Sequence, residues 1–81
     1  IPIRKAIYKI VMAHPYALQV HGFYVDRAKK EMRFDVVVRF GNDLQAILKE
    51  LHEEVQAAYP DYNILIDPDM DISAIGQGRH A

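Results

Sequence analysis

Residues 19–40, QVHGFYVDRAKKEMRFDVVVRF, decide the fold because they read as a β-hairpin. Residues 19–26 and 31–40 alternate with period two, which is typical of half-buried strands, and the polar DRAKK between them predicts a turn. The even positions form the apolar face: Val20, Gly22, Tyr24, Met32, Phe34, Val36, Val38 and Phe40. We expect this face to join a core. The odd face is mixed and carries a histidine in one strand and an aspartate in the other.

Helical patterns flank the hairpin on both sides. Residues 3–14 place apolar side chains at helical spacing, and residues 44–59 carry a second apolar stripe. Asn42 or Asp43 is a suitable N-cap for the second helix, with Gln45 as a possible capping-box partner. The hairpin is therefore expected to lie between two helices.

A third, short strand is predicted at residues 62–67, YNILID, and Pro68 should stop it. The right-handed crossover rule makes the second and third strands parallel, whereas the hairpin makes the first two antiparallel, so the sheet is mixed with order 1-2-3. Both helices should cover one face, since the other face is too polar to accept them. The predicted fold is an α+β, αββαβ two-layer sandwich, ferredoxin-like but lacking the first strand. Residues 1–75 would form this domain and residues 76–81 a frayed tail.

Composition narrows the possible functions. A chain of 81 residues is one domain with modest stability unless it associates with a partner. With a net charge of −1 and no dense basic stripe, nucleic acid is not an expected partner. The sequence has no cysteine, so a metal would have to be held by histidine, carboxylate or backbone groups. We find no arrangement typical of a catalytic site, no signal peptide, and no apolar run of the roughly 18 residues that a membrane span needs.

The odd face of the hairpin carries a candidate metal site. A three-residue loop at 27–29 would set a register in which His21 lies opposite Asp35, and the alternation of the third strand places Asp67 on the same face. One imidazole and two carboxylates suit zinc, iron, manganese and similar divalent ions. In the alternative interpretation, His21 and Asp35 are a cross-strand polar pair and Asp67 ends a strand, and spacing alone favours this alternative.

Four apolar residues are also predicted to face away from the helices: Phe23, Val25, Val37 and Leu65. Exposed together on a small domain, they would form an apolar patch of the kind that marks a protein interface. We therefore expect a homodimer that uses the outer side of the sheet or its flanks.

Four markers occur in order along the chain: a helix ending in HP (14–15), a VHGF strand (20–23), a helix ending in AYPDY (58–62) and an ILIDPD strand (64–69). Together, over about residues 3–73, they resemble the cytosolic C-terminal domain of cation diffusion facilitator transporters, membrane exporters of divalent metals. The resemblance implies an αββαβ homodimer on the cytoplasmic side of the membrane and a transmembrane bundle upstream of Ile1. That would explain why the sequence begins without methionine.

The resemblance also bears on the candidate metal ligands. His21 and Asp67 match ligand positions of the family, whereas Asp35, Gln45 and Leu65 stand where the family carries histidines. The remaining oxygen-rich set should bind zinc more weakly and tolerate iron or manganese. The expected function is a regulatory domain that senses metal and stabilises a transporter dimer. A metal-independent dimerisation module and a free-standing ferredoxin-like ligand sensor remain alternatives.

Overall fold

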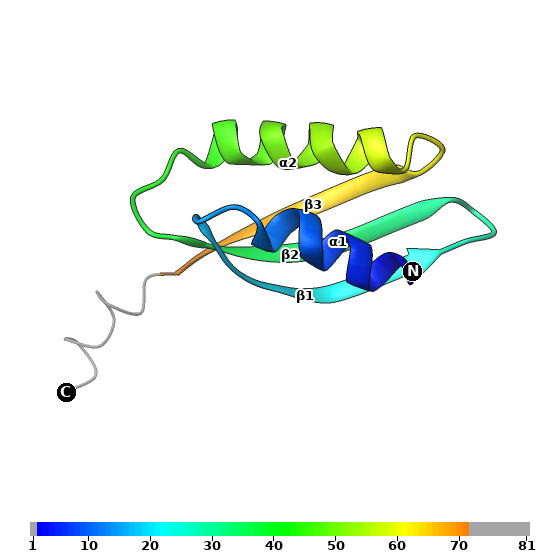
Figure 1. Ribbon diagram of the computed structural model, residues 1–81, viewed down its shortest axis with the longest axis horizontal. Coiled ribbons are helices and arrows are strands. Elements are labelled where there is room, and N and C mark those ends of the chain that lie inside the picture. The colour runs from blue at the N-terminus through cyan, green and yellow to red at the C-terminus, as the bar shows by residue number, and fades with distance from the viewer. Residues whose placement is uncertain (1, 72–81) are drawn as a thin grey trace.

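The computed structural model describes residues 2–71, which form two helices and a three-stranded sheet (Figure 1). The elements are α1 (Ile3–Met12), β1 (Ala17–Asp26), β2 (Glu31–Arg39), α2 (Leu44–Ala58) and β3 (Asn63–Asp71). The sheet has the order β1-β2-β3, with β1 and β2 antiparallel and β2 and β3 parallel. The predicted α+β fold is therefore confirmed. The expected frayed tail, residues 76–81, lies outside the described residues.

Both helices pack on one face of the sheet and share a single core with it (Figure 1). The buried side chains come from all five elements: Ile3, Ile7, Val11, Ala17, Met32, Phe34, Val36, Val38, Ile47, Leu51, Val55, Ile64 and Ile66. The central strand β2 contributes four of them at alternate positions, as its period-two pattern predicts. Within residues 2–71 no helix covers the opposite face, which we call the open face.

Helix α2 begins at an aspartate cap. Asp43 Oδ1 accepts a hydrogen bond from the backbone N–H of Ala46 at 3.2 Å. Asn42 instead donates from Nδ2 to the carbonyl of Arg39 at 2.9 Å, which helps to close the connection from β2. With Asp43 as N-cap, Ala46 occupies the position that would complete a capping box, so the predicted role of Gln45 is wrong.

The hairpin turn is one residue longer than predicted. Asp26 pairs with Glu31, so residues 27–30 form the connection. Asp26 Oδ1 accepts a hydrogen bond from Lys29 N at 2.9 Å, and Lys30 adopts a positive φ of 57°. Aspartate favours turns because its side chain can bond to the backbone that follows. The extra residue shifts the register beside the turn by one position.

A β-bulge in β1 removes this shift before the strand reaches His21. Gly22 and Phe23 together lie opposite Phe34, and Gly22 has a φ of 65°. A glycine with positive φ at the first bulge position is a common form of this irregularity, because glycine adopts that backbone conformation without steric cost. Past the bulge, His21 pairs with Asp35, as predicted.

Between the bulge and the turn, the residues of β1 lie on the opposite faces of the sheet from those predicted. Phe23 and Val25 pack against the core, and the Phe23 ring stacks on Phe34 with 6.3 Å between centroids. Tyr24 lies on the open face instead and is 48% exposed. The predictions that Tyr24 joins the core and that Phe23 and Val25 face away from the helices are therefore wrong. Phe40 follows the end of β2 and is 58% exposed, so it does not join the core either.

Strand β3 continues through Pro68 to Asp71, so the prediction that this proline stops it is wrong. The backbone N–H of Asn63 donates to the carbonyl of Lys30 at 2.8 Å, toward β2. Because backbone groups alternate in direction along a strand, the nitrogen of Pro68 faces away from β2. A proline tolerates that position because it removes no hydrogen bond of the sheet.

Candidate functional site

The three predicted metal ligands lie in one row across the open face. His21 on β1 pairs with Asp35 on β2, and Asp35 pairs with Asp67 on β3. The side chains of His21 and Asp67 are exposed, whereas Asp35 is half-buried. Because β3 extends beyond Pro68, Asp67 lies inside the strand and is held in register beside Asp35 rather than at a strand end.

Two members of the row approach each other closely. His21 Nδ1 lies 3.7 Å from Asp35 Oδ2, and the two side chains are 49% and 38% exposed. This distance is too long for a direct hydrogen bond. Two ligands bound to one tetrahedral ion, each about 2.0–2.2 Å from it, stand about 3.3–3.6 Å apart. The spacing of His21 and Asp35 is therefore close to that of a ligand pair.

Residues 2–71 of one chain do not supply a full ligand set. Within residues 2–71, no group of three or more histidine, cysteine, aspartate or glutamate side chains is placed to hold a metal ion. Asp67 shares the row but does not complete such a group. The donors suit a divalent cation chemically, and within residues 2–71 they form a partial set that further ligands would have to complete.

The next row of the open face consists of Tyr24 on β1, Arg33 on β2 and Leu65 on β3. Tyr24 lies under the Arg33 guanidinium, whose carbon is 5.8 Å from the ring centroid. Leu65 on β3 is 55% exposed and lies opposite Arg33 of β2. Tyr24, Arg33 and Leu65 help to line a shallow hollow of about 380 Å³. Val37, two positions beyond Asp35, is half-buried. We call Tyr24, Val37 and Leu65 the apolar patch. Arg33 lies between Tyr24 and Leu65, and the row of His21, Asp35 and Asp67 separates these two from Val37. Tyr24 takes the place of the two residues that the bulge moves to the core.

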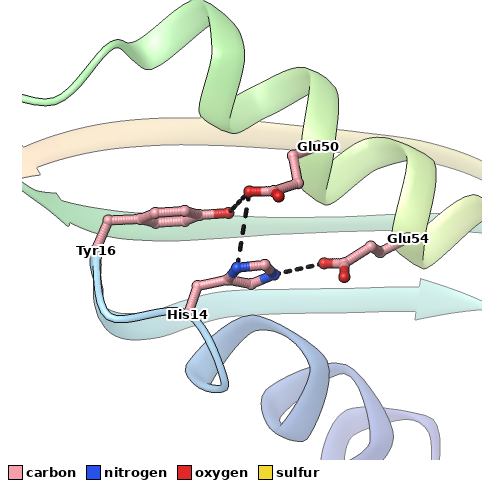
Figure 2. Close-up of polar contacts among 4 residues, drawn as sticks. All are labelled: His14, Tyr16, Glu50 and Glu54. Atoms are coloured by element: carbon pink, nitrogen blue, oxygen red, sulfur yellow. Dashed lines mark hydrogen bonds and ion pairs between the residues drawn. The ribbon is translucent and has the colours of Figure 1, made fainter.

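A second polar cluster, which the sequence did not reveal, joins the α1–β1 connection to α2 (Figure 2). His14 Nε2 lies 2.5 Å from Glu54 Oε1, and His14 Nδ1 lies 3.7 Å from Glu50 Oε1. The Tyr16 hydroxyl donates to Glu50 Oε1 at 2.7 Å, and the rings of Tyr16 and His14 stack with 4.8 Å between centroids. The two carboxylates face different nitrogens of the His14 ring. An ion bound to one of these nitrogens would therefore reach only one of the two carboxylates. We interpret the cluster as a structural contact that holds the α1–β1 connection against α2.

The cluster changes the chemistry of Tyr16. Burial of the phenol raises the pKa of Tyr16 well above its usual value, and the hydrogen bond to Glu50 and the charges of Glu50 and Glu54 raise it further. Glu50 and Glu54 are four residues apart on one helix, so sequence spacing places them side by side. Their partners lie 34 and 40 residues away along the chain, which is why no local pattern predicts the cluster.

The remaining positions that the resemblance singled out do not extend the row. Gln45 is exposed in the first turn of α2, on the helical side of the sheet. His52, also on α2, is half-buried, and its Nε2 donates to the carbonyl of Ile64 at 3.2 Å. His52 therefore ties α2 to the edge of β3, away from the open face.

No protein-family model matches this chain, and no curated protein matches it. Neither helix within residues 2–71 has the length and apolar character of a membrane-spanning segment. The function must therefore be argued from the site itself.

Proposed function

We propose that this chain is the homodimeric, metal-responsive regulatory domain of a divalent cation exporter of the cation diffusion facilitator type, on the cytoplasmic side of the membrane. The observation that carries the proposal is the row of His21, Asp35 and Asp67 on a face that neither helix covers. An imidazole and two carboxylates suit ions of the zinc, iron and manganese class. The fold is also the one that the family resemblance implies.

A second copy of the chain would complete the site. Among the described residues of the row, His21 and Asp35 are the pair that approaches closely and no three-ligand group forms, so we expect further ligands from a second chain. The apolar patch lies on the same face as the row, and dimerisation through this face would remove it from water. Metal binding and association would then share one surface, and a metal held between two protomers would stabilise the dimer.

Titration of zinc, manganese and iron(II) into the purified domain tests this proposal, with calorimetry and the thermal unfolding midpoint as readouts. If metal binds only the folded protein, free metal at about 100 times Kd should add about 2.7 kcal/mol of stability. We expect His21→Ala, Asp35→Asn and Asp67→Asn each to weaken binding by more than about tenfold. The matched control is Asp69→Asn, which removes an exposed carboxylate opposite Val37, outside the row. Equal losses in Asp67→Asn and Asp69→Asn would contradict a site at the row.

One observation favours a second candidate function, a dimerisation module that needs no metal. No three-ligand group is formed within residues 2–71, yet Tyr24 and Leu65 of the apolar patch are exposed on the open face. In that case the wild-type domain would be dimeric, and its unfolding midpoint would not respond to any of the three metals. Calorimetry and light scattering on the same samples separate the two functions.

A further inference from the structure

Gly22 lies where the Asp35 carboxylate needs space. A Cβ atom added to Gly22 would come within 2.7 Å of Asp35 Oδ2 and 3.3 Å of its Cγ. Cβ atoms essentially never approach another heavy atom as closely as 2.7 Å, so a larger residue would push the carboxylate aside. This carboxylate oxygen is the one that lies 3.7 Å from His21 Nδ1. The absence of a side chain at Gly22 therefore allows the Asp35 carboxylate to occupy this position beside the imidazole.

The backbone of Gly22 has a second effect on the same pair. If the register beside the turn, with Tyr24 opposite Arg33, continued without the bulge, His21 would lie opposite Val36. Val36 is fully buried in the core, so the imidazole would point toward the helices. The bulge, with Gly22 at a φ of 65°, turns His21 onto the open face instead.

We infer that Gly22 is the positioning residue of the candidate metal site: its bulge places His21 on the open face, and its missing side chain admits the Asp35 carboxylate beside the imidazole. The consequence for metal affinity rests on the proposed function. The consequence for the geometry of His21 and Asp35 does not, and it can be measured without metal.

Gly22→Ala tests the inference, and Gly41→Ala is its matched control. Gly41 also has a positive φ, 93°, but a Cβ there would meet no atom within 4 Å. Both variants therefore carry backbone strain, whereas only Gly22→Ala adds a contact with Asp35. In metal-free protein, NMR should show the Asp35 carboxyl carbon and the His21 ring signals shifted in Gly22→Ala and unchanged in Gly41→Ala. Unchanged Asp35 and His21 signals in a folded Gly22→Ala protein would overturn the inference.

Zinc titration gives the second readout. We expect Gly22→Ala to weaken zinc binding by about tenfold or more, and Gly41→Ala to leave it within about twofold of wild type. The inference is overturned if Gly22→Ala binds zinc as wild type does while His21→Ala does not. If wild type binds none of zinc, manganese and iron(II), and Gly22→Ala still moves both sets of NMR signals, the positioning role is supported and the proposed function fails.

A variant that does not fold is also informative. If Gly22→Ala is unfolded, the double variant Gly22→Ala/Asp35→Ser removes the carboxylate that the new methyl group meets, and it should fold. Recovery of the fold in the double variant supports the contact between position 22 and Asp35. If the double variant fails to fold while Gly41→Ala folds, the proposed contact between position 22 and the Asp35 carboxylate is overturned.

Discussion

Tyr16 is the residue whose ionisation the fold changes most clearly. Burial is the largest cause of its raised pKa, followed by the hydrogen bond to Glu50 and the charges of Glu50 and Glu54. A group whose pKa is raised by folding contributes stability that is fully present below its unfolded pKa, about 10 for tyrosine. That contribution is lost as the pH rises above this value toward the folded pKa. The protein should therefore lose stability in alkaline solution partly through Tyr16.

An ultraviolet absorbance titration of phenolate formation checks this prediction. The chain has five tyrosines, and we expect one of them to ionise later than the others or only upon unfolding. Tyr16→Phe should remove that late step. Glu50→Gln should move it to lower pH without abolishing it, since the burial of Tyr16 remains. Simultaneous ionisation of all five side chains in the folded protein would show that the Tyr16 cluster does not protect its phenol.

At the scale of the elements, strand and helix periodicity was sufficient to predict the order αββαβ and the mixed sheet. It could not predict the four-residue turn or the bulge at Gly22, because each depends on how two strands fit together. The pairing of His21 with Asp35 was predicted correctly although the turn was not. Two one-residue shifts, one at the turn and one at the bulge, offset each other before the strand reaches His21.

The course of β3 and the His14 cluster escaped prediction for a related reason. Pro68 stops a strand only where its missing N–H would have bonded to a neighbour, and here that side of the backbone faces away from β2. His14 meets Glu50 and Glu54 only because the α1–β1 connection packs against α2 (Figure 2). In both cases the deciding contact joins segments that are distant in sequence.

Helix α2 allows a direct test at its first turn. Asp43→Ala removes the side-chain bond to Ala46 N and should lower the free energy of unfolding by about 1 kcal/mol. Asp43→Asn is the matched control, because asparagine caps helices nearly as well and should retain most of the stability. Urea unfolding followed by circular dichroism measures both. An equal loss in the two variants would assign the effect to the charge of Asp43 rather than to its capping bond.

At the scale of the whole molecule, the two faces of the sheet differ in burial: one packs against the helices and the other is not covered by a helix within residues 2–71. The helical face holds the core, and the open face carries both the candidate metal row and the apolar patch. A chain of 81 residues can bury only a limited area by itself, so covering the open face would add stability that the monomer lacks. This division of faces is the reason that the dimer interface we propose lies on the sheet rather than on the helices.

Leu65 provides the test of that interface. Because Leu65 is 55% exposed on the open face, Leu65→Lys should leave the monomer folded and shift the dimer toward monomer. Tyr8→Lys is the matched control, since Tyr8 is 51% exposed but lies on α1, in the helical layer. Light scattering over a concentration series, with and without zinc, measures the effect. A wild-type protein that stays monomeric in every sample would contradict the dimer, and dissociation by Tyr8→Lys alone would move the interface to the helices.

His21→Ala, measured in the same series, connects the interface to the metal. If the apolar patch supplies most of the association energy and the metal adds to it, His21→Ala should remain dimeric without metal and lose the tightening that zinc produces. Its unfolding midpoint without metal should stay near that of wild type, because the imidazole is exposed and lies outside the core. A His21→Ala protein that unfolds without metal would instead show that the row serves the fold itself.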